Sequence, residues 1–182
     1  MIKTKKDLKR YLAEDLNRFN DKKPSIQDWI LHNEVWYIFH YIRHLRYIEY
    51  YKNSGKNRIL FLYHFFRYKH LGFKLKFTIR PNTVGPGFRI YHAGDIVHVG
   101  DFCKIGKHCT MQPGVVIGNK YEHDTDAQVN IGDNCYIGLG VKIFGPLIIG
   151  NNVTIGANAV VTKDFSDNCV IGGIPAKIIK YL

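Results

Sequence analysis

The sequence predicts a mainly β protein in which short strands coil around one axis, preceded by an α-helical region. An apolar residue recurs every six residues from Val99 to Val161. This period fits neither the 3.6-residue turn of a helix nor the two-residue alternation of an open strand. It fits a solenoid that turns a corner every six residues and stacks one aliphatic side chain per corner along its axis.

Three kinds of residue mark each repeat. An aliphatic residue or methionine comes first, glycine follows most of these, and a small or medium apolar residue usually stands four places after the first. The first positions are Val99, Ile105, Met111, Ile117, Ile131, Ile137, Ile143, Ile149, Ile155 and Val161. The period fails between Ile90 and Val99. It fails again over residues 119–128, whose polar and acidic composition predicts a loop extruded from one coil.

The N-terminal part of the chain has a different character. Residues 1–76 hold 17 Lys and Arg against 7 Asp and Glu, whereas residues 77–182 hold 9 against 8. We therefore expect a basic, aromatic helical region over residues 1–76 and a repeat domain over residues 77–182.

Apolar residues three and four apart predict helices at about residues 4–19, 25–32, 34–51 and 57–70. Ser25 is a candidate N-cap of the second helix, and Gly55 should end the third. Leu71 and Gly72 should lead out of the fourth.

The basic, aromatic helices have three possible roles. One face of the third helix carries Ile38, Ile42, Leu45 and Ile48. We expect this face to pack on the first coil or across subunits. Contact between the basic helices and an anionic membrane is an alternative. Nucleic-acid binding is not expected, because no motif supports it.

The sequence also predicts a compartment. The N-terminus is charged and no apolar core follows it, so no secretory signal is expected. The run Ile59–Tyr63 is far too short to span a bilayer. Cys103, Cys109 and Cys135 occupy inward positions of the repeat, where a thiol acts as a compact hydrophobe, and neither disulfides nor a metal site is expected. These features favour a cytoplasmic protein, with contact at the inner membrane face left open.

Residues 85–97 read Gly-Pro-Gly-Phe-Arg-Ile-Tyr-His-Ala-Gly-Asp-Ile-Val. Together with the hexads, the loop at 119–128 and the ending Gly173–Lys177, they resemble the hexapeptide-repeat acyltransferases. Within that class the sequence resembles the serine acetyltransferase group, and it is closest to small members encoded with surface-polysaccharide genes. The resemblance implies a left-handed β-helix, an exception to the usual right-handed crossover. It also implies a homotrimer that uses acetyl-CoA as co-substrate.

The sequence departs from the serine enzymes at three places. Tyr91 stands where they have an aspartate before the active histidine, and Thr78 stands where a second aspartate orients that histidine. The chain ends at Leu182, without the tail that docks on the next enzyme of cysteine synthesis, so this docking is not expected. The departures favour a sugar hydroxyl over serine as acceptor, since an aromatic ring can stack on a pyranose face.

The resemblance makes His92 the candidate catalytic base. Acetyl transfer to an alcohol needs a group that takes the hydroxyl proton, and the ordinary pKa of histidine suits this task. His123 in the extruded loop is a second candidate. Tyr91 and Asp95 are the candidate acceptor-binding residues.

Outward turns of the later coils are the expected acetyl-CoA wall. By resemblance, the backbone of Leu139 and Ala157 lines the groove for the pantetheine arm. Gly140 and Asn158 stand beside them, and Lys163 and Lys177 are candidates for the phosphates.

Two further readings stay open. Serine acetyl transfer is the alternative reaction, and a non-catalytic trimeric scaffold is the alternative class. A zinc carbonic anhydrase on the same solenoid would need histidines five residues apart, which the chain does not supply.

Overall fold

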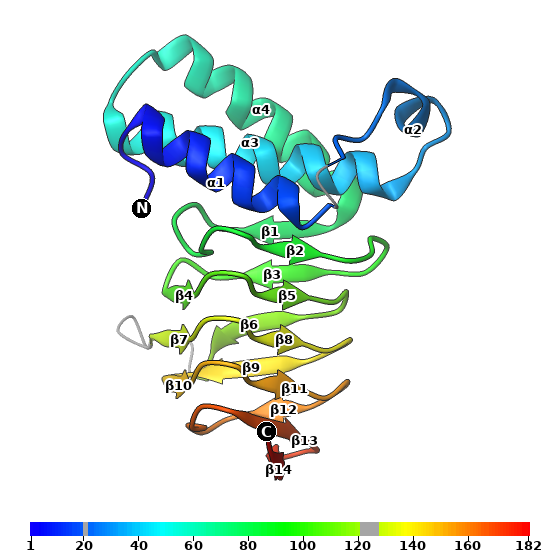
Figure 1. Ribbon diagram of the computed structural model, residues 1–182, viewed down its shortest axis with the longest axis vertical. Helices are drawn as coiled ribbons and strands as arrows, with labels where there is room; N and C mark the ends of the chain where they lie inside the picture. The colour runs from blue at the N-terminus through cyan, green and yellow to red at the C-terminus, as the bar shows by residue number, and fades with distance from the viewer. Residues whose placement is uncertain (20–21, 121–127) are drawn as a thin grey trace.

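The strands of residues 77–182 stack in three parallel sheets that form the sides of a left-handed β-helix (Figure 1). The structure is a computed structural model, and it describes residues 1–19, 22–120 and 128–182. The first sheet contains β1 (Phe77–Ile79), β3 (Val97–Val99), β6 (Val116–Asn119), β9 (Lys142–Gly145) and β12 (Val160–Val161).

The other two sheets complete each coil. The second sheet contains β4 (Cys103–Ile105), β7 (Val129–Ile131) and β10 (Leu147–Ile149). The third contains β2 (Arg89–Ile90), β5 (Thr110–Met111), β8 (Tyr136–Ile137), β11 (Thr154–Ile155) and β13 (Cys169–Gly172). The last strand, β14 (Lys177–Tyr181), pairs antiparallel with β13.

The register confirms the six-residue period. Val99 pairs with Ile117, which pairs with Ile143, which pairs with Val161. All four are fully buried, so each aliphatic side chain packs on its equivalents in the coils above and below. Stacking of this kind buries a continuous core that no single coil could form.

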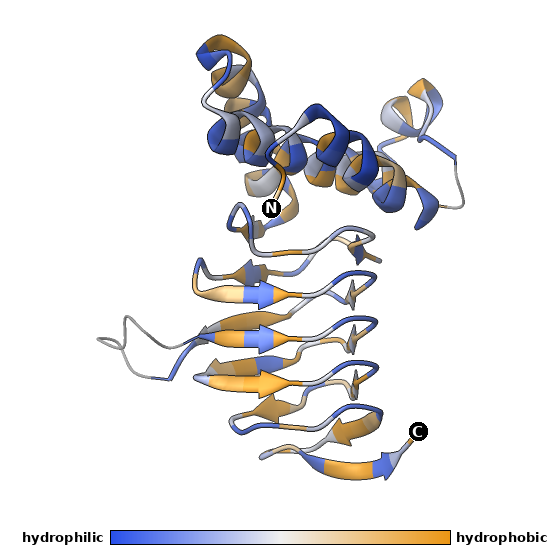
Figure 2. Ribbon diagram, turned by 60° about the vertical axis from the view of Figure 1, so that its left-hand side comes forward, coloured by the Kyte–Doolittle hydropathy of each residue, from blue (hydrophilic) through white to orange (hydrophobic). Residues whose placement is uncertain are grey.

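Four helices cover one end of the coil (Figures 1 and 2). They are α1 (Lys5–Asn17), α2 (Ile26–Ile30), α3 (Glu34–Ser54) and α4 (Arg58–Leu75). Ser25 caps α2 as predicted, and its hydroxyl accepts a hydrogen bond from the N–H of Asp28. Gly55 ends α3 with a φ of 65°, also as predicted.

The predicted end of α4 is wrong. The helix continues through Gly72 to Leu75. Gly72 is buried, and a Cβ atom there would lie 2.7 Å from the carbonyl oxygen of Phe77. Glycine therefore lets the helix approach the first strand closely instead of ending the helix.

The predicted packing of α3 on the first coil is confirmed. Ile38, Ile42, Leu45 and Ile48 are all buried in the core shared with the coil. The Tyr41 hydroxyl accepts a hydrogen bond from the N–H of Ile79 at 3.0 Å. These contacts join the helical region to β1.

Arg46 is a buried cation in the middle of α3, which the sequence did not single out. Its guanidinium contacts Asp15 of α1 at 2.8 Å and Glu49 at 3.2 Å. It also donates to the carbonyl oxygens of Val84 and Gly85 at 2.8 and 2.6 Å. One side chain thus links α1, α3 and the first coil, and its charge is compensated by two carboxylates.

We expect Arg46→Ala to destabilise the fold by about 3–5 kcal/mol, because it leaves two buried carboxylates without their partner. Urea unfolding followed by circular dichroism measures this change. Lys52→Ala, an exposed change on the same helix, is the matched control and should shift stability by less than about 0.5 kcal/mol. Equal midpoints for the two variants would contradict a linking role for Arg46.

Candidate active site

His92 lies at an open corner of the β-helix. It follows β2 within residues 91–96, the irregular turn through which the third sheet leads into the first. Its side chain is 63% exposed and so is accessible from solvent. The same corner recurs on later coils at residues 112–115, 138–141 and 156–159, and we call it the His92 corner.

Glu34 holds the His92 ring in place. It is the first residue of α3, and its Oε1 lies 2.7 Å from Nδ1 of His92. Its Oε2 accepts a hydrogen bond from the N–H of Ala93 at 2.9 Å. A carboxylate can only accept, so Nδ1 carries the proton and donates it. In the neutral ring, Nε2 is then unprotonated and free to take a proton.

Hydrogen bonds keep Glu34 ionised. Partial burial acts to raise the pKa of the Glu34 carboxyl, but the bonds donated by Ala93 and His92 outweigh it, so this pKa lies below its usual range. An ionised carboxylate favours the Nδ1–H form of the ring and stabilises a positive charge on it. The pair has the geometry of a general base with an orienting carboxylate.

Thr78, the position of the family's orienting aspartate, lies in β1 and pairs in register with His98. The carboxylate beside His92 therefore comes from the helical region and not from the first strand. In this chain, the first residue of α3 places its carboxylate beside His92.

The candidate acceptor-binding residues lie on either side of His92 in the turn. Tyr91 is exposed, with the Arg89 guanidinium 4.1 Å from the centre of its ring. Asp95 Oδ1 accepts a hydrogen bond from the N–H of Ile96 at 2.7 Å. A Cβ atom on Gly114 would lie 3.0 Å from Asp95 Oδ2, so Asp95 lies against the next coil of the His92 corner.

Four of the predicted acetyl-CoA residues stack below Asp95 on this corner. Leu139 and Ala157 are exposed, and Gly140 and Asn158 follow them on the same two coils. The N–H of Asn158 donates to the carbonyl of Leu139 at 2.7 Å, which fixes the spacing between these coils. A Cβ atom on Gly140 would collide with the Asn158 side-chain oxygen.

The two predicted phosphate ligands lie at different places. Lys177 is exposed and follows Ala176, whose N–H donates to the carbonyl of Val160 at 2.8 Å. Lys163 is exposed beyond the far end of β12, where its Nζ lies 5.6 Å from the centre of the Phe165 ring. Lys163 is therefore at another corner of the chain from Leu139 and Ala157.

His123 lies outside the described residues. Within the described ranges, no three His, Cys, Asp or Glu side chains gather as a metal site would require. Cys103, Cys109, Cys135 and Cys169 are free and buried. Burial raises the pKa of the Cys103 thiol to about 12, which makes it a poor nucleophile.

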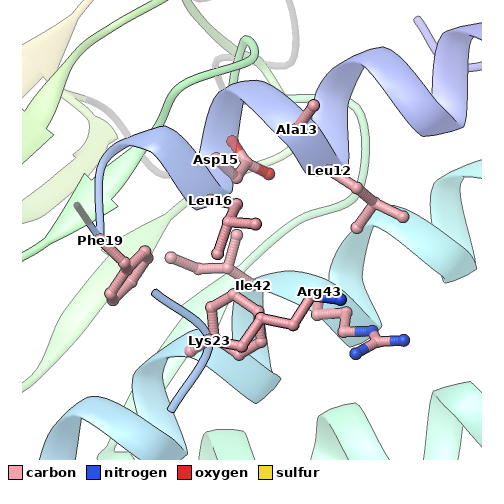
Figure 3. Close-up of a pocket in the computed structure, with 9 residues that line it drawn as sticks. Leu12, Ala13, Asp15, Leu16, Phe19, Lys23, Ile42 and Arg43 are labelled. Atoms are coloured by element: carbon pink, nitrogen blue, oxygen red, sulfur yellow. The ribbon is translucent and has the colours of Figure 1, made fainter. Parts of the chain in front are cut away.

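A cavity of about 230 Å³ lies between α1 and α3 (Figure 3). Its described lining consists of Leu12, Ala13, Asp15, Leu16, Phe19, Lys23, Phe39, Ile42 and Arg43. None of these residues belongs to the His92 corner, and the Asp15 carboxylate is already bound by Arg46. The cavity is therefore not part of the candidate active site.

Comparison with known proteins agrees with this architecture. The family model of the bacterial transferase hexapeptide, described as six repeats, matches residues 128–163. The crystal structure of a serine acetyltransferase from Brucella abortus in complex with coenzyme A superposes with a TM-score of 0.77 at 23% identity. That superposition covers 97% of this chain and 69% of the other.

The chain has the fold of the serine acetyltransferases, with the hexapeptide repeat matched at residues 128–163.

Curated relatives match shorter stretches of the chain than the superposed structure does. A serine acetyltransferase from Synechococcus elongatus is 33% identical over 72 residues, which is 40% of this chain and 30% of the relative. The candidate lipopolysaccharide biosynthesis O-acetyl transferase WbbJ of Escherichia coli K12 is 48% identical over 52 residues, 29% of this chain and 26% of that protein. The matched part of the chain thus spans less than a third of the length of these relatives.

Two residues that contact the His92 corner, Glu34 and Lys142, were missed by the sequence analysis. Glu34 is 58 positions from His92 and looks like an ordinary acidic residue in a first helical turn. Lys142 donates through Nζ to the carbonyl oxygens of Gly114 and Gly140, the latter at 2.9 Å, and so holds adjacent turns together. Neither role leaves a signal in the hexapeptide pattern.

We expect Glu34→Ala to change the tautomer of His92. In the native protein, the neutral ring should carry its proton on Nδ1, because Glu34 accepts that bond. Nitrogen-15 NMR of the labelled imidazole should show a shift toward the Nε2–H form in the variant. The control is Glu14→Ala, which removes the carboxylate 3.5 Å from His108 and should leave the His92 signals unchanged. An unchanged His92 tautomer in Glu34→Ala would contradict the pairing.

Proposed function

We propose that this protein transfers the acetyl group of acetyl-CoA to an acceptor hydroxyl, with His92 as the general base. The observation that carries the proposal is the His92–Glu34 pair at an exposed corner, with Nε2 free. The likeness to serine acetyltransferases, one of them solved with coenzyme A, supports the choice of reaction.

The reaction follows from the geometry of the pair. Nε2 of His92 takes the hydroxyl proton as the acceptor oxygen attacks the thioester carbonyl. The tetrahedral intermediate then collapses, the carbon–sulfur bond breaks, and the protonated ring returns its proton to the departing CoA thiolate. The new ester and free CoA leave the site.

Glu34 acts on His92 and not on the substrate. Its negative charge stabilises the imidazolium that forms during the transfer, and its second oxygen is fixed by Ala93. The ring is thereby held in one orientation before substrate arrives, so little reorganisation is required as the charge develops.

The His92 corner is the proposed acetyl-CoA wall. The exposed turns at Leu139 and Ala157 offer backbone groups along a line that leads from Asp95 toward Lys177. An extended pantetheine arm laid on this line would bring its thioester toward His92. Lys177 would then be the cation nearest the phosphate end within the same chain.

Lys163 is expected to act on a neighbouring subunit. It lies at a different corner from Ala157, so it does not belong to the same wall. In the proposed homotrimer, one chain's wall would be completed by the adjacent chain, and Lys163 is the residue we propose to reach across.

Serine is the acceptor that the comparisons favour. Curated relatives from Synechococcus elongatus, Mycobacterium tuberculosis and Staphylococcus aureus are named serine acetyltransferases, so they support this alternative better than the sugar acceptor favoured by the sequence analysis. Two observations keep a sugar hydroxyl as the second candidate. Tyr91 presents an exposed ring beside His92, and the WbbJ match has the higher identity.

Removal of the base should abolish most of the activity. We expect His92→Ala to lower kcat/KM by about 10²–10⁴-fold in an assay that follows CoA release from acetyl-CoA and serine or sugar acceptors. His108→Ala, at a different corner, is the matched control and should keep native activity. Equal CoA release by native protein and His92→Ala with every acceptor would overturn the proposed function.

Tyr91→Asp separates the two acceptors. The change removes the aromatic ring and introduces the acidic residue that the resemblance to the serine enzymes predicts at this position. Turnover of serine should rise at least about tenfold, because a gained charge-assisted hydrogen bond is worth about 1.5–3 kcal/mol. Turnover of any sugar should fall, because the ring that would contact it is lost. The measurement is kcat/KM for serine and for a panel of hexoses and amino sugars. Unchanged values for both classes would show that Tyr91 does not contact the acceptor.

A further inference from the structure

The outer face of α4 carries a largely apolar, solvent-exposed stripe. Seven exposed residues recur at spacings of three and four, so they share one helix face. They are Ile59, Leu62, Tyr63, Phe66, Lys69, His70 and Phe73. Ile59 is 80% exposed, Phe66 66% and Phe73 91%. We call this set the α4 stripe.

The rest of α4 explains why the stripe is unusual. On the opposite face, Tyr68, Leu71 and Leu75 are buried in the core shared with α3 and β1. The helix is thus apolar on both faces, whereas a helix of that kind is normally buried on all sides. α4 lies at the end of the molecule opposite the C-terminus (Figure 1).

The surface around the stripe is strongly basic. No Asp or Glu occurs anywhere in residues 50–94. Lys69 is an exposed cation within the stripe, and the exposed cations Lys56, Arg58 and Lys74 lie near the two ends of the helix. Large apolar side chains and cations therefore share one face that holds no carboxylate.

We propose that the α4 stripe lies on the surface of an anionic lipid bilayer. A helix bound in the plane of a membrane inserts apolar side chains at the headgroup boundary while Lys and Arg contact anionic lipids. The 18 residues of α4 form a rod of about 27 Å that can lie flat on such a surface. No helix of the described chain is long and apolar enough to cross a membrane, so α4 would rest on the bilayer.

Other occupants fit these observations less well. A second copy that met the first through the same face would place Arg58, Lys69 and Lys74 against like charges. Nucleic acid would satisfy the cations, but it would leave Ile59 and Phe73 in contact with phosphates and water. A bilayer meets both requirements at once.

The proposal can be tested with full-length protein and vesicles. Native protein should cosediment with vesicles of phosphatidylcholine and phosphatidylglycerol, bind weakly to phosphatidylcholine alone, and dissociate as salt screens the charges. Phe66→Ser with Phe73→Ser should reduce the partition coefficient at least about tenfold. Ile26→Ser with Ile30→Ser, two exposed aliphatic residues of α2, is the matched control and should bind like native protein.

A second pair of variants tests the charge. Arg58→Glu with Lys69→Glu should weaken binding about 25-fold or more, since each cation near an anionic surface contributes about fivefold. Lys5→Glu with Lys9→Glu makes the same change in net charge on α1 and should weaken binding much less. Thermal unfolding should give native midpoints for all four variants, because every substituted side chain is exposed.

Three outcomes would overturn the proposal. The first is no sedimentation with anionic vesicles. The second is equal loss of vesicle binding in the α2 or α1 control variants, which would show that binding depends on overall hydrophobicity or net charge and not on the α4 stripe. The third is that the α4 variants instead change the sedimentation coefficient of free protein or the affinity for an RNA oligomer. CoA release in solution should be native in the α4 variants, so a failure here is distinct from a failure of the proposed function.

Discussion

The position of α3 on the first coil is the constraint on which the rest of the structure depends. Arg46 fixes it by contacting Asp15 on one side and the carbonyls of Val84 and Gly85 on the other. Glu34 lies 12 residues earlier in the same helix, about 18 Å along a rigid rod. The buried ion pair thus lies in the same helix as the carboxylate that contacts His92, and it ties that helix to the first coil.

The β-helix contributes regularity, and the candidate site uses both the regular coils and one irregular turn. Stacked turns at residues 138–141 and 156–159 present nearly identical edges, which suits a long, extended substrate. Residues 91–96 lengthen the corner, so that His92 and Tyr91 project from it. An extended acetyl-CoA molecule and the His92 ring could then meet along one edge of the β-helix, because both would lie at the His92 corner.

Much of this arrangement was predictable from the sequence, and the failures have a common cause. The hexads, the cap at Gly55 and the location of His92 in a break all depend on neighbours along the chain or on a short period. Glu34, Arg46 and Gly72 depend on how the helices lie against the first coil, and each contacts residues that local patterns do not link to it. At Gly72 the sequence predicts a helix end where the helix continues, because close packing and chain reversal both favour glycine.

The origin of the carboxylate changes how the two regions of the chain should be understood. The resemblance to the serine enzymes predicts an orienting carboxylate at position 78, inside the first strand, where this chain has Thr78. Here it comes from Glu34, and a coil without its helices would present His92 with no acidic partner. The helical region therefore contributes a side chain to the candidate site and also covers the end of the coil.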